Sequence, residues 1–204
     1  MAEDNTVIGV APETAGNSLS NAMDFIIRQT VRNYVNTSLP VIVMKTYPGG
    51  TGGAAGYVDI KPLVCQTDSR GRALPPTEIY HVPYFRLQSG VAAVVLDPVP
   101  GDIGIGVFAQ SDSSALSQGA TAPVQPGSWR SFDQADAFYV GGFLNKKPSL
   151  WIELTQDGKI NINASGGITI NAPSVDITGD MISGGKSYLD HTHMGVHGET
   201  TPPL

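Results

Sequence analysis

The sequence predicts a mainly β protein with one helix near its start, a small barrel in the middle and a short repeated β-segment near its end. Three observations support this prediction. The 204 residues include 24 Gly and 15 Pro, a composition typical of many short strands joined by turns. Apolar residues fall at helical spacing within residues 18–39. From residue 150 onwards they alternate with polar ones and recur about every eight residues.

Composition and charge narrow the classes of function. The formal net charge is −6 and shows no basic excess, which argues against nucleic acid as a partner. Cys65 is the sole cysteine, so an intrachain disulfide and a multi-cysteine zinc site within one chain are excluded. The start lacks the pattern of a signal peptide, and no apolar run reaches the roughly 18 residues of a membrane span. We therefore expect synthesis in the cytoplasm, with any membrane contact coming later.

Residues 1–40 are predicted to form a flexible arm and a helix. Residues 1–17 are mostly small or polar, with Pro12 and Gly16 among them. Ser18 or Ser20 can cap the helix, and we expect Pro40 to close it. The apolar face of this helix comprises Leu19, Met23, Ile26 or Ile27, Thr30 and Tyr34. Two roles stay open for it: covering the end of the next domain, or docking a partner.

Residues 41–112 contain short strand candidates at 41–47, 57–68, 79–88, 91–96 and 103–110, the last two joined by a tight connection. No helical crossover separates them, which favours a small closed or nearly closed barrel. An oligonucleotide/oligosaccharide-binding (OB) barrel is the leading candidate, and a sandwich is the alternative. His81 is assigned a structural role, and the Gly-rich loop at 49–56 has no assigned role. The polar stretch at 113–147 is interpreted as a linker or neck.

Residues 148–186 carry the repeat. Ile152, Ile160 and Ile168 are spaced by eight, and Leu154, Ile162 and Ile170 follow at the same interval; after Pro173 the register slips to Val175 and Ile177. One copy of this segment cannot close a core, because a monomeric coil of strands usually needs roughly 20 residues per turn. Three chains wound into a triple β-helix would each supply one face of a prism and pair the open strand edges. The alternative is an ordinary antiparallel meander.

Residues 187–204 are predicted to form an apex with a metal site. His191 and His193 stand one residue apart, so on an extended chain they point the same way, roughly 6.6 Å apart. Threefold symmetry would bring six imidazoles to one axis. Six nitrogen ligands suit an octahedral ion, whereas zinc prefers four, so iron or nickel fits better. The alternative is a frayed tail with solvent-facing histidines. His197 is expected to lie on a turn outside the ligand set.

Four segments together resemble the central spike proteins of contractile-tailed phages, also called baseplate assembly protein V. They are the PGDIGIGVF hairpin, the stretch from Arg130 to Phe138, the DGKININASGGITINAPSVDITGD repeat and the terminal HTHMGVHGETTPP. The resemblance runs from about Val41 to Leu204. It implies a homotrimer with an OB-fold collar and an intertwined triple β-helix. It also implies a sharp apex where one iron ion per trimer is held by His191 and His193 of all three chains.

The resemblance also implies the function. Such spikes are not enzymes: they pierce the host outer membrane mechanically when the tail sheath contracts. The chain would then reside in the virion, at the tip of the tail tube in the baseplate, with a hub protein at its N-terminal end.

Two other functions remain as alternatives. One is a β-helical enzyme degrading polysaccharide or peptidoglycan, which needs two converging carboxylates. Asp157, Asp176 and Asp180 are its candidates, with Trp151 as a sugar platform, but these carboxylates fall at turns or outer positions. The other is an OB barrel that binds glycan or single-stranded nucleic acid. The acidic balance and the lack of paired basic and aromatic residues on 91–96 or 103–108 argue against it.

Overall fold

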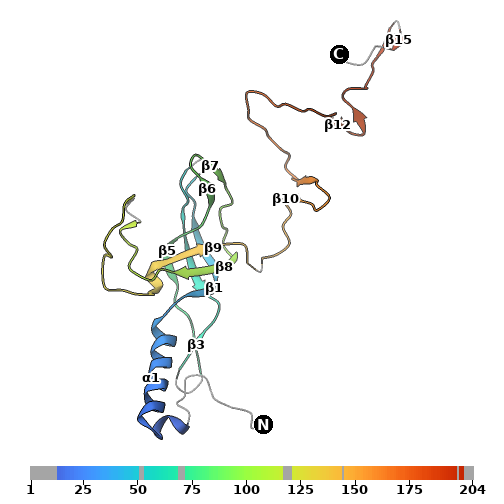
Figure 1. The fold of residues 1–204 in the computed structure, drawn as a ribbon. Helices are drawn as coiled ribbons and strands as arrows, with labels where there is room; N and C mark the ends of the chain where they lie inside the picture. The colour runs from blue at the N-terminus through green and yellow to red at the C-terminus, as the bar shows by residue number, and fades with distance from the viewer. Residues whose placement is uncertain are drawn as a thin grey trace. The chain divides into compact units, whose positions relative to one another are not determined.

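The computed structural model describes residues 13–50, 53–68, 72–116, 121–143, 145–196 and 198–199 (Figure 1). The chain divides into two compact units, Met1–Lys146 and Lys147–Leu204. The described part is mainly β, with a single α-helix near its start. Within it, no helix is both long enough and apolar enough to cross a bilayer.

The first elements are a short 3-10 turn, η1 (Glu13–Gly16), and helix α1 (Leu19–Tyr34). The predicted cap is confirmed at Ser18, whose hydroxyl accepts a hydrogen bond from the amide of Asn21 at 3.1 Å. The predicted end at Pro40 is wrong, because the helix stops at Tyr34. The ring of Pro40 disfavours helical conformation in the residue before it. The chain is therefore extended before Pro40, which lies inside strand β1 (Ser38–Tyr47).

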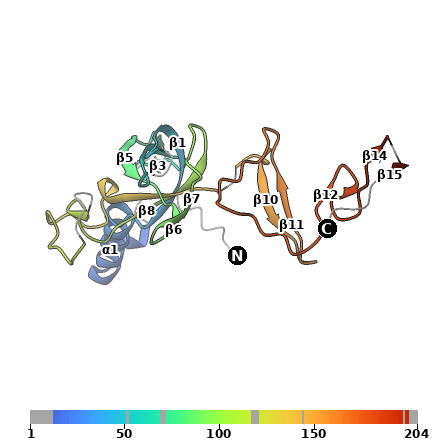
Figure 2. The same cartoon turned by 90° about the horizontal axis from the view of Figure 1, so that it is seen from above.

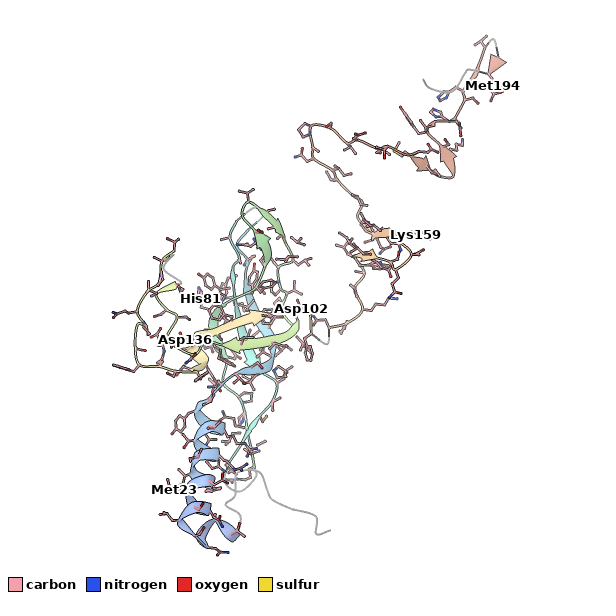
Figure 3. All side chains as sticks on the ribbon, in the orientation of Figure 1. Met23, His81, Asp102, Asp136, Lys159 and Met194 are labelled. Atoms are coloured by element: carbon pink, nitrogen blue, oxygen red, sulfur yellow. The ribbon has the colours of Figure 1, made fainter. Side chains whose placement is uncertain are left out.

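The apolar face of α1 is uncovered: no residue of this helix is buried. Figure 3 shows its side chains, Met23 among them, standing in open space. The exposed apolar residues are Leu19, Met23, Ile26, Ile27, Val31 and Tyr34. Within the described residues this face does not cover the neighbouring sheet, and the docking role stays a prediction.

Five strands form one antiparallel sheet in the order β5-β2-β1-β8-β9. The four strands besides β1 are β2 (Tyr57–Pro62), β5 (Ile79–Pro83), β8 (Ile103–Phe108) and β9 (Ala137–Val140). Its two edges meet, because Tyr84 and Tyr139 form a parallel bridge and the Phe85 amide donates to the Tyr139 carbonyl at 2.8 Å. The sheet is therefore curled into a partly closed barrel.

Two short hairpins extend from this sheet. Strand β3 (Gln66–Thr67) pairs with β4 (Ala73–Leu74), and β6 (Leu87–Ser89) pairs with β7 (Ala92–Val94). The predicted strand at 91–96 is thus not a barrel strand paired with 103–110. Its run of consecutive apolar residues lacks the alternation of a half-buried strand, and all of residues 87–96 are exposed.

The last strand of the sheet, β9, comes from the stretch predicted as a linker. Its burial alternates, with Ala137 and Tyr139 inside and Phe138 and Val140 more exposed. A barrel boundary at residue 112 therefore leaves out one strand of the sheet, and 113–147 is more than a neck. The stretch also contains the 3-10 turn η3 (Gln134–Asp136).

The core lies inside the curled sheet. Glycines at the inward positions of β8 make room for it, since a Cβ on Gly104 would lie 2.5 Å from the ring of Tyr139. This close approach explains the glycines of the IGIGVF segment. Among the described residues, this core cluster comprises Val41, Val43, Val58, Ile60, Ile79, Val82, Tyr84, Phe108, Ala137 and Tyr139.

In its described part, the second unit contains three small hairpins. Strand β10 (Trp151–Leu154) pairs antiparallel with β11 (Ile160–Asn163), and the two lie side by side in Figure 2. Strand β12 (Ile182–Ser183) pairs with β13 (Lys186–Ser187), and β14 (Met194–Gly195) with β15 (Gly198–Glu199). Residues 164–181 form no strand within one chain. None of the described residues from 147 to 199 is buried.

Candidate subunit interface and metal site

The β10–β11 hairpin has one apolar face and one largely polar face. Ile152 lies opposite Ile162, and Leu154 lies opposite Ile160, so the four side chains share a face. Their exposed fractions are 67%, 52%, 78% and 65% in that order. A continuous uncovered apolar surface of this kind is typical of an interaction site.

The opposite face is bonded within the chain. The side-chain amide of Asn161 donates to the carboxylate of Glu153 at 3.1 Å, and that of Asn163 donates to the Ser149 carbonyl at 2.8 Å. In the connecting turn, Lys159 lies 2.7 Å from Asp157, and this hydrogen bond lowers the pKa of the Asp157 carboxyl. The polar face is thus hydrogen-bonded within one chain, whereas the described residues leave the apolar face uncovered.

The apolar pattern continues beyond the hairpin. Ile168 and Ile170, and then Val175 and Ile177, are 53–67% exposed and belong to no strand. Burying one such side chain contributes about 1.5–3 kcal/mol, and this segment leaves that contribution unused in a single chain. The first two repeat units do form the antiparallel hairpin of the meander alternative, but no described layer covers them.

The predicted metal ligands lie together. The ring centroids of His191 and His193 are 4.9 Å apart, with the ring planes at 86°. Nδ1 of His191 lies 2.7 Å from the carbonyl oxygen of Tyr188. When Nδ1 carries the proton and donates it to this carbonyl, Nε2 keeps its lone pair. This contact is the type that orients metal-binding histidines.

The backbone around the histidine pair is fixed by local hydrogen bonds. Asp180 accepts from the amides of Tyr188 and Leu189 at 3.1 and 3.2 Å. Its pKa is lowered, first by the Ser187 hydroxyl and then by these amides. Thr192 donates to the carboxylate of Glu199 across the β14–β15 hairpin. The chain therefore returns on itself on both sides of the histidines.

One chain supplies an incomplete ligand set. Among the described residues, no group of three or more His, Cys, Asp or Glu side chains is placed to hold a metal. His197, expected to lie outside the ligand set, falls outside the described residues. Two neutral imidazoles are suitable donors for iron or nickel, but two ligands do not fill the six positions of an octahedral ion.

The carboxylates considered for hydrolysis are held apart in local contacts. Asp157 is paired with Lys159 in the β10–β11 turn, and Asp180 accepts backbone amides near β12. Asp176 is exposed on a segment without strand structure. These contacts do not create the pair of converging carboxylates that glycoside hydrolysis requires.

Two polar clusters in the first unit were not predicted. The side chain of Arg86, 2% exposed, lies 2.6 Å from Asp97 and donates to the Gly53 carbonyl at 2.6 Å. It thereby anchors the Gly-rich loop, whose role the sequence left open. Hydrogen bonds from Tyr84 first, and from Arg86, lower the pKa of Asp97. Asp97 follows Arg86 by eleven positions, a spacing that no regular sequence pattern marks.

The second cluster holds the loop between β8 and β9. The Ser128 hydroxyl donates to Asp112 at 2.6 Å, and Arg130 lies 3.0 Å from Asp112 and 3.3 Å from Asp136. Hydrogen bonds from Ser114 and Ser128 lower the pKa of Asp112 to about 2. The sequence marked the stretch from Arg130 to Asp136 only through the family resemblance.

His81 occupies a strained position in β5. Its φ of 59° is uncommon for a residue with a side chain, and its amide donates to the buried carboxylate of Asp59 at 2.9 Å. The imidazole stacks on Tyr57 with 4.9 Å between centroids. These contacts give His81 a local structural role, as the sequence suggested.

In comparisons with known proteins, no family model matches this chain, and no curated protein matches its sequence.

Proposed function

We propose that this chain is the central spike of a contractile injection tail, a homotrimer that pierces the host outer membrane when the sheath contracts. The observation that carries the proposal is the uncovered apolar face of the repeat, with Ile152, Leu154, Ile160 and Ile162 more than half exposed. Three copies around one axis would turn these faces inward and bury them. The polar faces, already bonded within each chain, would stay outside.

The tip of the spike would hold one iron ion per trimer. His191 and His193 of three chains supply six imidazoles, and the Tyr188 carbonyl orients His191 in each. An ion held by all three chains would pin their ends together at the point that meets the membrane. The ion's role is structural, and the function we propose requires no bond-making chemistry, so the spike is not an enzyme.

The first unit would serve as the collar. Its curled sheet of five strands with partly closed edges supports an OB-fold-like barrel. The exposed apolar face of α1 supports docking of a baseplate hub protein at this end. The chain would be made in the host cytoplasm and act in the virion, at the tip of the tail tube. Its net charge of −6 gives no support to a nucleic-acid partner.

Tail particles carrying an epitope tag on this chain test the function. Immunogold electron microscopy should place the label at the tip of the tube in the baseplate. Particles whose copy lacks residues 147–204 should still contract but fail to release the contents of host-derived outer-membrane vesicles. A label along the sheath, or full vesicle release by the truncated particles, would contradict the proposal.

A further inference from the structure

We propose that Trp129 of each chain inserts into a pocket on the next chain of the trimer, so that the collar units interlock. This inference rests on the homotrimer proposed above. Trp129 lies in the loop between β8 and β9 and is fully exposed, at 102% of its reference area. Tryptophan is among the side chains that contribute most to the binding energy of protein interfaces, where it fills a desolvated pocket.

The residues on either side of Trp129 are held by local contacts. Both neighbours in sequence are bonded to buried carboxylates: Ser128 to Asp112 at 2.6 Å, and Arg130 to Asp112 and Asp136 at 3.0 and 3.3 Å. Figure 3 shows Asp136 beside the sheet, at the base of this loop. Just before them, a Cβ on Gly127 would lie 2.7 Å from the Ser114 hydroxyl, so a side chain there would disturb the turn. An anchor held in advance loses little conformational entropy when it binds.

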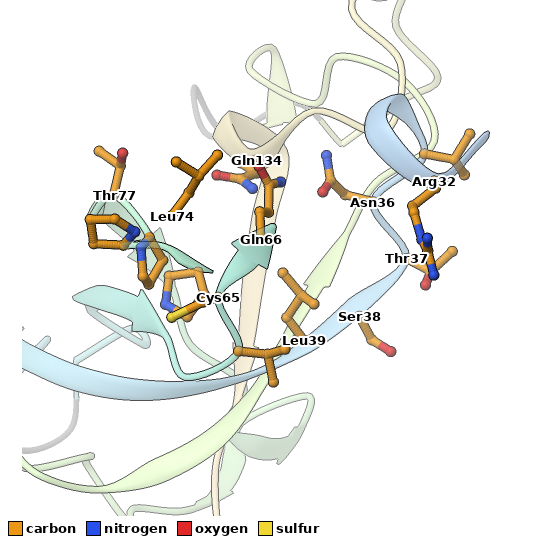
Figure 4. Close-up of a pocket in the computed structure, with 15 residues that line it drawn as sticks. Arg32, Asn36, Thr37, Ser38, Leu39, Cys65, Gln66, Leu74, Thr77 and Gln134 are labelled. Atoms are coloured by element: carbon orange, nitrogen blue, oxygen red, sulfur yellow. The ribbon is translucent and has the colours of Figure 1, made fainter. Parts of the chain in front are cut away.

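A pocket of suitable size lies in the first unit, and Gln134, from the β8–β9 loop that also carries Trp129, is among its lining residues. It is bounded by the end of α1, the start of β1 and the β3–β4 hairpin, and its volume is about 260 Å³ (Figure 4). A cavity of about 150 Å³ is enough for benzene, so this one has room for the larger indole ring. Its apolar walls include Val35, Leu39, Val64, Leu74, Pro75 and Pro76.

The charges of the two surfaces are complementary. Arg32 is the one charged residue that lines the pocket, and within the described part of the chain it forms no ion pair. The Trp129 loop carries Asp112, Asp133 and Asp136 against Arg130, a formal charge of −2; Asp112 and Asp136 are buried, and Asp133 is partly exposed. A guanidinium also binds favourably over the face of an indole.

The occupant is a second copy of the chain. Trp129 does not line its own pocket, and moving it there would break the bonds from Ser128 and Arg130 to the buried carboxylates. Between copies related by rotation about one axis, a projecting side chain on one meets a pocket on the next. Such a contact closes when three chains complete the ring, and every pocket is then filled.

Cross-linking tests this arrangement, because Cys65 lines the pocket and is the chain's sole cysteine. A Trp129→Cys chain, treated with a short bis-maleimide, should give covalent dimers and trimers on a denaturing gel. A Trp129→Cys/Cys65→Ser chain lacks the thiol in the pocket and should give no covalent dimers or trimers through this contact. Val124→Cys lies in the same loop but outside the turn held by Ser128 and Arg130, and it should cross-link weakly.

Thiol labelling of Cys65 provides a second readout in the otherwise native chain. Trp129→Ala should raise the rate of reaction with a disulfide reagent about tenfold or more, since an inserted indole covers the thiol. Trp151→Ala, in the second unit, should leave the rate unchanged.

Three results would overturn the inference, and they are distinguishable. Cross-links confined within single chains would mean that each loop fills its own pocket. Absent cross-links and an unchanged labelling rate, in a protein with the mass of a trimer, would refute the contact and leave the spike standing. A monomeric mass would refute the trimer itself.

Discussion

At the residue scale, the closeness of His191 and His193 follows from the sequence, whereas their role as metal ligands stays a prediction. A spacing of one residue needs only an extended chain to bring the rings together, and the centroids lie 4.9 Å apart. The hydrogen bond from His191 to the Tyr188 carbonyl could not be predicted, because it depends on how the chain turns after β13. The pairs Arg86–Asp97 and Ser128–Asp112 were missed for a similar reason, because contacts between folded loops follow no regular spacing in the sequence.

Replacing both histidines tests the metal site. His191→Ala/His193→Ala should remove the metal found by elemental analysis and loosen the last turns, while the chain stays trimeric through its apolar repeat. His197→Ala should keep the ion. Because imidazole binds a metal only when neutral, protons compete with the ion, and the ion should be lost as the pH is lowered. No metal in the wild-type trimer, or metal retained by the double variant, would refute the site.

Asp112 should make the first unit sensitive to acid. Its folded pKa is lowered from 3.8 to about 2, so its carboxylate stabilises the fold above pH 3.8. This contribution is lost as pH falls from about 4 towards 2. Thermal unfolding followed across this range should show a steeper loss of stability for the wild type than for Asp112→Asn. Asp176→Asn, at an exposed site in the repeat, is the matched control, and an equal slope in all three proteins would contradict the assignment.

At the scale of elements, the sequence predicts helices and strands well where an apolar period continues. It fails where pairing between distant segments determines which strands join the sheet. The cap of α1, the strand at 41–47 and the alternation of the repeat all follow from local patterns. The sheet includes β9 rather than the 91–96 segment. The parallel contact between Tyr84 and Tyr139 that closes the sheet joins residues far apart in the sequence, so no local pattern predicts it. The apolar character of 91–96 alone gave no way to foresee its exposed hairpin.

The two faces of the repeat should respond differently to charge. Ile162→Asp and Ile170→Asp would each place three carboxylates in the apolar interior of the trimer, where unpaired charge is very costly. We expect loss of soluble trimer on size exclusion. Thr169→Asp, beside Ile170 on the chain, should be tolerated. It is a better control than Asn163→Asp, which would remove the hydrogen bond to Ser149. Equal tolerance on both faces would show that the inward residues are wrongly assigned.

Removal of α1 should separate attachment from assembly. A chain starting at Val35 keeps Asn36, whose side chain donates to the Phe132 carbonyl at 2.7 Å, and all of β1. We expect it to form a metal-containing trimer that no longer joins tail particles, because the docking face is gone. Pull-down of the hub by the full-length chain, but not by the truncated one, measures this. Failure of the truncated chain to trimerise would show that the helix, whose Arg32 lines the pocket for Trp129, is required for assembly.

At the scale of the whole molecule, the two units differ in what one chain can stabilise. The first unit closes a core of ten buried apolar residues within a single chain. The second unit, in its described part, buries none and leaves its apolar repeat uncovered. This difference is the physical reason for proposing several copies, because a segment without a core is not stable alone.

The mass in solution tests this account most directly. Sedimentation equilibrium of the full chain at micromolar concentration should give three times the 21.4 kDa of one chain. The trimer should also resist dissociation by detergent, since separating intertwined chains requires unwinding them along the whole repeat. A folded species with the mass of one chain under these conditions would contradict the trimeric spike.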